Sequence, residues 1–277
     1  MSRYSAMFAR CAAANEGAFG AFLMLGDPSL EQSAAALDAM VVGGADMLEL
    51  GIPFSDPIAD GPVIQAAAAR ALAAGVRTAD CFDLVATIRQ RHRDIPIGIL
   101  TYANIVVARG LDRFTRELAA AGADSLLIAD VPSVEAERFT RASAAAGLDP
   151  VMIAAPNTPR AVLDRIAALS SGYTYCVARA GVTGADRDLT LDHGALFAAL
   201  ASAGAPPPVL GFGIATPAHV AEALASGAAG VISGSAIVRR MAEGASPQAL
   251  SEFVSAMKAA TRRAPTTAGA SGGATGA

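Results

Sequence analysis

The chain has 277 residues, 53 % of them hydrophobic, and a net charge of −4 at pH 7 that is spread along the sequence. The length and composition allow a large buried core, and the lack of a basic patch argues against nucleic-acid binding. No apolar run reaches the ~18 residues of a membrane span and the amino terminus does not resemble a signal peptide, so we expect a soluble cytoplasmic protein.

Short apolar segments of β-rich composition alternate with longer Ala- and Leu-rich segments of helical period. This alternation is typical of repeated βα units and a parallel sheet. Strands are expected to begin near Phe19, Met47, Ile97, Ser125, Pro150, Tyr173, Pro208 and Gly230. Eight parallel strands in one domain most simply close into a barrel, so we predict an α/β fold of the (β/α)8 TIM barrel class.

The helix after the second strand has the clearest boundaries. Gly61 precedes Pro62, which suits a first helical position, and Gly75 follows the Ala-rich body as a stop signal. Residues 264–277 are rich in Ala, Gly, Ser and Thr, a composition that predicts a disordered tail. Because no linker interrupts the rest, residues 1–263 are predicted to form a single barrel domain.

Glu49 is the first candidate catalytic residue. In the expected strand around it, Met47, Glu49 and Gly51 share one face, whereas Leu48 and Leu50 share the other. The aliphatic face suits packing under helices, so Glu49 is expected to point into the barrel near the active-site end. Desolvation there would raise its pKa toward neutrality. The structural alternative is a carboxylate held by a buried arginine or by backbone amides.

Asp60 is the second candidate. It lies in the loop of residues 53–61, just ahead of the helix that begins at Pro62, where free amides and the helix dipole favour an anion. We expect it to remain ionised. Taken alone it could simply cap the helix, but one carboxyl pushed toward protonation beside another held charged is how a site assigns acid and base roles. Asp56 of the same loop is interpreted as a turn residue.

Three glycine-bearing segments follow the sixth, seventh and eighth expected strands. They are residues 181–184, 211–214 and 233–236, and in the last of them Ser235 could cap a short helix whose amino end faces an anion. Barrels bind phosphate in this way after strands seven and eight, without needing a cationic side chain. Each segment alone could be an ordinary turn.

The sequence offers no metal site. Cys11, Cys81 and Cys176 are far apart and outside any CxxC spacing, and His92, His193 and His219 share no short ligand spacing. We therefore expect reduced thiols and no metal.

The segment from Leu48 to Gln65, LELGIPFSDPIADGPVIQ, resembles the signature of the tryptophan synthase alpha subunit family. Further segments resemble motifs of that family in the same order: residues 25–28, 129–132, 179–184, 211–214 and 232–237. The resemblance extends from about Tyr4 to Arg263. It implies a lyase that cleaves indole-3-glycerol phosphate to indole and glyceraldehyde 3-phosphate in a retro-aldol reaction.

The same resemblance implies roles for individual residues. Glu49 would transfer protons and Asp60 would stabilise positive charge on the indole nitrogen. An indole pocket would comprise Phe22, Leu100, Leu127, Ala129, Ile153, Tyr175, Phe212 and Ile232, most of which could equally be barrel core. Substrate phosphate and a lid would involve Thr183, Gly184, Gly211, Gly213, Gly234 and Ser235.

For partners, the resemblance implies a tryptophan synthase beta subunit in an α2β2 complex. Pyridoxal phosphate would be held by that partner, and no cofactor by this chain. The expected contact surfaces are residues 53–57 and the segments around Asn104 and Pro132. Three alternatives remain open: a free-standing lyase, a catalytically idle phosphosugar-binding module, and another phosphate-binding barrel such as an isomerase.

Overall fold

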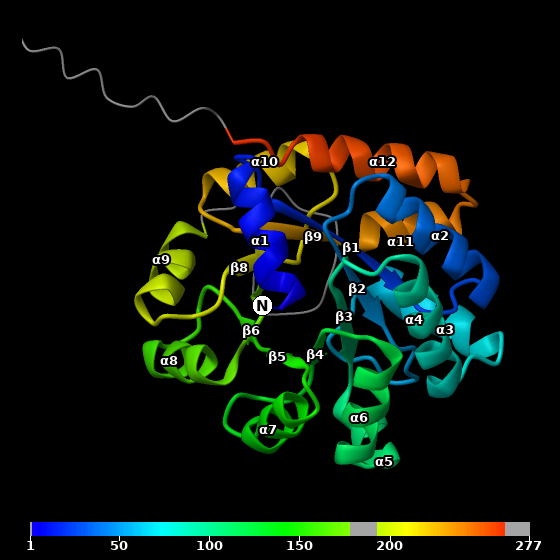
Figure 1. Cartoon of the computed structure of the whole chain (residues 1–277), viewed down its shortest axis with the longest axis horizontal. Coiled ribbons are helices and arrows are strands. Elements are labelled where there is room, and N and C mark those ends of the chain that lie inside the picture. The colour runs from blue at the N-terminus through cyan, green and yellow to red at the C-terminus, as the bar shows by residue number, and fades with distance from the viewer. Residues whose placement is uncertain (1, 178–192, 264–277) are drawn as a thin grey trace, which may run out of the picture.

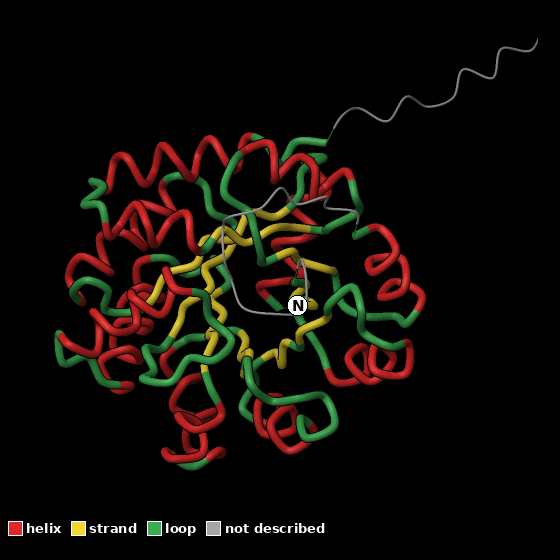
Figure 2. The backbone as a smooth tube through the Cα atoms, turned by 180° about the vertical axis from the view of Figure 1, so that it is seen from behind, coloured by secondary structure: helices red, strands yellow, loops and turns green. Residues whose placement is uncertain are grey.

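Helices surround a ring of parallel strands (Figure 1, Figure 2). The structure is a computed structural model that describes residues 2–177 and 193–263. Its strands are β1 (Ala18–Met24), β2 (Met47–Gly51), β3 (Ile97–Thr101), β4 (Ser125–Ile128), β5 (Asp149–Val151), β6 (Ile153–Ala154), β7 (Thr174–Cys176), β8 (Pro208–Leu210) and β9 (Gly230–Ser233). Its helices are α1 (Arg3–Ala13), α2 (Leu30–Val42), α3 (Pro62–Ala73), α4 (Thr78–Arg91), α5 (Ala103–Arg109), α6 (Leu111–Ala121), α7 (Glu137–Ala145), α8 (Arg160–Leu169), α9 (Gly194–Ser202), α10 (Pro217–Ala225), α11 (Ser235–Ala242) and α12 (Pro247–Ala259). None of these helices is long and apolar enough to span a membrane.

The barrel prediction is confirmed, with one strand interrupted. Hydrogen bonding orders the strands β5-β4-β3-β2-β1-β9-β8-β7-β6, and only Met152 separates β5 from β6. The chain itself therefore joins the two ends of the sheet, and the predicted fifth strand near Pro150 is present as two short pieces. Each of the eight expected strand starts lies within one residue of an observed start.

Side-chain alternation along the strands separates two buried clusters. Leu48, Leu50 and Ile52 pack between the strands and the helices, whereas Met47 belongs to a cluster inside the barrel. This is the facing that the sequence of β2 predicts, because successive side chains of a strand point to opposite sides. Glu49 shares the side of Met47 and is therefore an interior residue.

Helix α1 covers the amino-terminal end of the barrel (Figure 1). Its buried residues Tyr4, Met7 and Cys11 join the interior cluster. Two ion pairs attach it to residues that precede strands: Arg3 contacts Asp124 at 2.8 Å and Arg10 contacts Asp46 at 2.9 Å. With this end covered, the interior is accessible to a ligand from the carboxyl ends of the strands.

The helix after β2 starts and stops as the sequence predicts. Gly61 is the N-cap of α3, Pro62 is its first residue, and Gly75 follows the end with a φ of +81°. A bare backbone tolerates that left-handed conformation without steric cost. The predicted disordered tail, residues 264–277, lies outside the described residues.

A partly buried ion pair joins α3 to the loop after β1. Arg70 Nε and Nη2 donate to the two carboxylate oxygens of Asp27 at 2.7 and 2.8 Å. The Asp27 side chain is only 1 % exposed, whereas that of Arg70 is 37 % exposed. The pair thus ties α3 to the loop that follows β1.

We expect Arg70→Leu to lower the free energy of unfolding by about 1–3 kcal/mol, because it leaves the Asp27 carboxylate buried without its cation. This expected loss of stability is smaller than the roughly 3–5 kcal/mol for breaking a fully buried ion pair, because the Arg70 side chain is partly solvated. Urea-induced unfolding measures the effect. The matched control is Arg141→Leu, whose side chain is 74 % exposed and 3.9 Å from Glu137; a change within about 0.5 kcal/mol is expected there. Equal effects of the two substitutions would contradict the prediction.

Candidate active site

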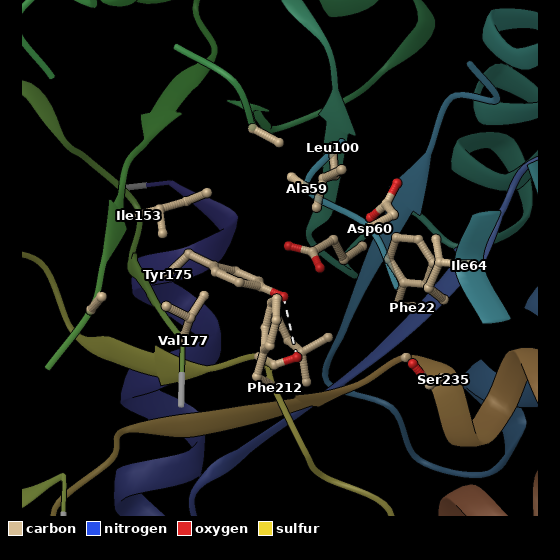
Figure 3. Close-up of a pocket in the computed structure, with 16 residues that line it drawn as sticks. Phe22, Ala59, Asp60, Ile64, Leu100, Ile153, Tyr175, Val177, Phe212 and Ser235 are labelled. Atoms are coloured by element: carbon tan, nitrogen blue, oxygen red, sulfur yellow. Dashed lines mark hydrogen bonds between the residues drawn. The ribbon is translucent and has the colours of Figure 1, made fainter. Parts of the chain in front are cut away.

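A cavity of about 280 Å³ lies at the carboxyl-terminal end of the barrel (Figure 3). Its walls are mostly apolar, and Glu49 and Asp60 are the only ionisable carboxyl groups among the described residues that line it. The lining residues are Phe22, Glu49, Ala59, Asp60, Ile64, Leu100, Ala129, Ile153, Ala155, Tyr175, Val177, Gly211, Phe212, Ile232, Gly234 and Ser235. Apolar walls with a few convergent polar groups are typical of a small-molecule site.

The structure brings together most of the residues expected to form an indole pocket. Phe22, Leu100, Ala129, Ile153, Tyr175, Phe212 and Ile232 all line the cavity. Leu127 does not: it is 2 % exposed and packs in the interior cluster below. Ala129, two residues further along the chain on the same side, takes the position at the cavity wall.

Four lining residues were not anticipated from the sequence: Ala59, Ile64, Ala155 and Val177. Ala155 and Val177 lie two residues beyond Ile153 and Tyr175, so continuing the strand alternation past the strand ends would have found them. Ile64 comes from α3, and no local pattern shows which side of that helix faces the cavity.

Glu49 is buried in the barrel interior with a neutral partner. It is 2 % exposed, and the Tyr173 hydroxyl donates a hydrogen bond to its Oε1 at 2.9 Å. Burial raises its pKa to about 8, the nearby Asp60 charge adds to this effect, and the Tyr173 hydrogen bond opposes it. Among the described residues no arginine forms an ion pair with Glu49, so the partner expected for a purely structural carboxylate is not found there.

Asp60 is buried to a lesser degree. It is 7 % exposed, and the Tyr102 hydroxyl donates to its Oδ2 at 2.9 Å. The Tyr102 ring in turn stacks on Phe54, with centroids 5.2 Å apart. Burial raises the pKa of Asp60 to about 6 and the Tyr102 hydrogen bond opposes the rise. Asp60 is therefore mostly ionised at neutral pH.

The two carboxyl groups consequently differ in protonation state at neutral pH. Glu49, with its pKa near 8, carries a proton, whereas Asp60, with its pKa near 6, is mostly an anion. Groups whose environments separate their pKa values in this way can act as acid and as electrostatic stabiliser in one cavity. The arrangement can deliver a proton to a bound ligand and can stabilise positive charge that develops on it.

The amino end of α11 meets the cavity at Ser235 (Figure 3). Gly234 and Ser235 both line the cavity. Gly234, rather than Ser235, is the N-cap, and Ser235 is the first helical residue, so the expectation that Ser235 caps this helix is wrong. The free amides of such a helix end favour an anion. Gly213, with a φ of +78°, does not line the cavity.

Gly211 lets the backbone after β8 approach Tyr175. A Cβ at this position would lie 2.0 Å from the Tyr175 ring carbon Cζ, which is too close for any side chain. The Tyr175 hydroxyl donates to the Gly211 carbonyl oxygen at 3.2 Å (dashed in Figure 3), so in this arrangement it is engaged with the backbone. Thr183 and Gly184, expected at the lid, lie outside the described residues.

No metal-binding cluster is found in residues 2–177 and 193–263, where no group of three or more His, Cys, Asp or Glu side chains could hold an ion. Cys11, Cys81 and Cys176 are free and buried, and none of them lines the cavity. His92 lies 2.7 Å from Asp38, and the Nδ1 atom of His219 accepts from the Ala215 amide. The cavity therefore has no thiol or imidazole in its walls.

Sequence reasoning missed the two tyrosines that contact the carboxyl groups. Tyr173 precedes β7 and Tyr102 follows β3, yet both side chains are buried at 1 % and 2 % exposure. A phenol at the end of an expected barrel strand is a signal for a buried hydrogen-bond donor, since its hydroxyl needs a partner once the ring is buried. Which carboxyl it contacts depends on strands distant in sequence.

Comparisons with known proteins agree with this geometry. The profile of the family described as "Tryptophan synthase alpha chain" matches residues 8–266. The tryptophan synthase alpha chain of Shewanella amazonensis is 52 % identical over 94 % of this chain and 100 % of its own length, and that of Escherichia coli strain SMS-3-5 is 49 % identical over 95 % and 100 %.

Solved structures give the same result. A tryptophan synthase structure from Mycobacterium tuberculosis superposes with a TM-score of 0.87 at 33 % identity, covering 95 % of this chain and 99 % of that one. Tryptophan synthase subunit alpha from Legionella pneumophila strain Paris gives 0.84 at 30 % identity, over 94 % and 98 %. This barrel holds two buried carboxyl groups of different pKa over an apolar cavity, and members of one family match it along nearly its whole length. The chain belongs to the tryptophan synthase alpha chain family.

Proposed function

We propose that this chain cleaves indole-3-glycerol phosphate to indole and glyceraldehyde 3-phosphate, as the alpha subunit of tryptophan synthase in tryptophan biosynthesis. The observation that carries the proposal is the pairing of Glu49 and Asp60, at different protonation states, over one apolar cavity in a chain of this family. The reaction is a retro-aldol cleavage, which needs proton transfer at carbon and oxygen and no redox step.

Glu49 is assigned both proton transfers. Its protonated carboxyl donates a proton to indole C3, and the resulting ring cation accepts the electron pair of the breaking bond to the glycerol carbon. The hydroxyl on that carbon loses its proton to the Glu49 carboxylate and becomes the aldehyde, so the proton on Glu49 is restored. A pKa near 8 suits a group that must give and take a proton near neutral pH.

Asp60 is assigned the stabilisation of charge. Protonation at C3 places positive charge on the ring nitrogen, and a carboxylate that accepts a hydrogen bond from this N–H stabilises the transition state more than the ground state. The hydrogen bond from Tyr102 fixes the Asp60 carboxylate in one orientation. Electrostatic stabilisation of this kind requires groups that are already oriented before the reaction.

The remaining lining residues are assigned to binding. The indole ring would lie among Phe22, Leu100 and the other apolar side chains of the cavity, with Leu127 supporting them from below. The phosphate would lie against the amides of the lining residues Gly211, Gly234 and Ser235, and Gly213 would contribute its amide from beyond the cavity wall. No described residue that lines the cavity carries a positive charge, so the amides and the α11 dipole would supply the attraction.

The partner is proposed to be a tryptophan synthase beta subunit in an α2β2 complex, with pyridoxal phosphate held by that subunit and no cofactor by this chain. Exposed apolar side chains support an interface at the cavity end of the barrel: Ile58 is 72 % exposed, Val107 53 % and Val134 63 %. They lie in or beside the segments expected to contact the partner. Residues 1–263 are proposed to act as one catalytic domain, located in the cytoplasm.

The function is tested by adding indole-3-glycerol phosphate to the purified chain and following indole release, with beta subunit as the variable. We expect indole to form, and its rate to rise about tenfold or more with beta subunit, the size of a typical coupling between sites. Full turnover by the isolated chain would instead indicate a free-standing lyase. No indole under either condition would refute the proposed function.

Glu49→Gln is expected to lower kcat for indole release by a factor on the order of 10²–10⁴, because an amide cannot transfer the proton. The amide oxygen can still accept the Tyr173 hydrogen bond, so the fold should be retained, as circular dichroism would show. Glu243→Gln, an exposed residue at the end of α11, is the matched control and should keep wild-type kcat. Undiminished activity of Glu49→Gln would show that the assigned role is wrong.

The raised pKa of Glu49 also makes a prediction for stability. The folded state binds this proton more tightly than the unfolded state, so the contribution is fully present below about pH 4.5 and is lost as pH rises through 8. Glu49→Gln cannot undergo this loss. We expect its free energy of unfolding, relative to wild type, to increase by more than about 1 kcal/mol between pH 5 and pH 9. Urea unfolding at both pH values measures it, and a constant difference would count against the buried carboxyl.

A further inference from the structure

Three hydroxyl groups gather around Gly98 below the cavity. A Cβ on Gly98 would lie 2.8 Å from both Ser125 Oγ and the Tyr4 hydroxyl, and 3.6 Å from the Tyr173 hydroxyl. Strand pairing places Gly98 between Glu49 of β2 and Ser125 of β4. The missing side chain therefore makes room, beside Glu49, for side chains that come from α1 and from the segment before β7.

A continuous series of contacts runs from this cluster to Glu49. The Tyr4 hydroxyl and Ser125 Oγ are 2.8 Å apart, and the Tyr4 and Tyr173 rings pack with centroids 5.2 Å apart at 50°. The Tyr173 hydroxyl then donates to Glu49 Oε1 at 2.9 Å. All four residues are at most 2 % exposed, so water does not compete with these contacts.

Tyr173 lies outside the regular hydrogen bonding of β7, so packing against neighbouring side chains orients its ring. Tyr173 precedes β7, which begins at Thr174, and follows Gly172, whose φ is +72°. Its amide bonds locally to the Ser171 carbonyl oxygen instead of joining the sheet. Tyr4 packs along this turn, since a Cβ on Gly172 would lie 3.2 Å from Tyr4 Cδ2. The Tyr4 ring is thus one of the buried side chains that limit where the Tyr173 ring can lie.

We propose that Tyr4 is a positioning residue for the lyase reaction: its ring, anchored by Ser125, holds Tyr173 so that the Tyr173 hydroxyl keeps the Glu49 carboxyl in its reactive orientation. The proposal rests on the function proposed above, in which Glu49 transfers the protons. It gives α1, the helix that covers the far end of the barrel, an indirect part in catalysis that acts through Tyr173.

Attachment of α1 does not by itself account for this arrangement. The helix is held to the barrel by the Arg3 and Arg10 ion pairs and by burial of Met7 and Cys11. Tyr4 is the residue of α1 whose ring and hydroxyl extend to the groups around Glu49. A misplacement of a catalytic group by about 1 Å can cost a factor of roughly 100 in rate, so a loosened support is measurable.

The test compares Tyr4→Leu, Tyr4→Phe and Tyr173→Phe with the wild type, in the chain with beta subunit. Tyr4→Leu is expected to lower kcat for indole release about tenfold and to change KM less than about twofold, because binding residues are untouched. Tyr4→Phe keeps the ring and should stay within about threefold of the wild-type kcat. In the Tyr173→Phe background, adding Tyr4→Leu should cause little further loss, since the two residues act in series.

Met7→Ala is the control for general loosening, because it removes buried volume from the same helix one turn away. It should lower stability in urea while keeping kcat. If Tyr4→Leu does not fold, Tyr4→Met, which also lacks the ring but fills more space, carries the same expectations.

Three results would overturn the proposal: wild-type kcat in folded Tyr4→Leu or Tyr4→Met, an equal kcat loss in Met7→Ala, or the same fold loss from Tyr4→Leu with and without Tyr173→Phe. A wild-type chain that releases no indole, alone or with beta subunit, would instead refute the proposed function on which this inference depends.

Discussion

The burial inside the barrel of a carboxyl group that has no ion-pair partner among the described residues is the constraint on which the site depends. Glu49 is 2 % exposed and has a phenol for a partner, so its ionised form is poorly stabilised and its pKa rises to about 8. Burying such a group costs stability unless it is paired or used. The surrounding structure tolerates the group in its neutral form, which is the form that can give a proton to a ligand.

The rest of the fold maintains this environment. Helix α1 covers the amino-terminal end of the barrel, where its buried side chains exclude water from the interior. Small residues inside the barrel leave space for larger side chains. A Cβ on Gly20 would lie 2.6 Å from Ile232, and one on Gly98 would meet two hydroxyl oxygens. The glycines of the inner layer thus admit the aromatic and aliphatic groups that exclude water around Glu49.

Periodic features of the sequence predicted the strands and the inward direction of Glu49, because alternation and βα spacing are local signals. The break of the fifth strand at Met152 was not predictable, since it occurs where the two ends of the sheet meet and no local pattern marks it. The family resemblance predicted most of the residues that line the cavity, but it did not predict the roles of Tyr102 and Tyr173. Their roles depend on contacts between residues 42 and 124 positions apart.

The difference in pKa between the two carboxyl groups comes mainly from burial and not from their hydrogen-bond partners. Each accepts one tyrosine hydroxyl at 2.9 Å, and in both cases this hydrogen bond opposes the rise in pKa. Glu49 lies within the barrel, whereas Asp60 lies in the loop above it, so desolvation affects Glu49 more strongly. The negative charge of Asp60 raises the pKa of Glu49 further. Depth in one barrel, together with the effect of the Asp60 charge on Glu49, is therefore sufficient to make one carboxyl an acid and the other an anion.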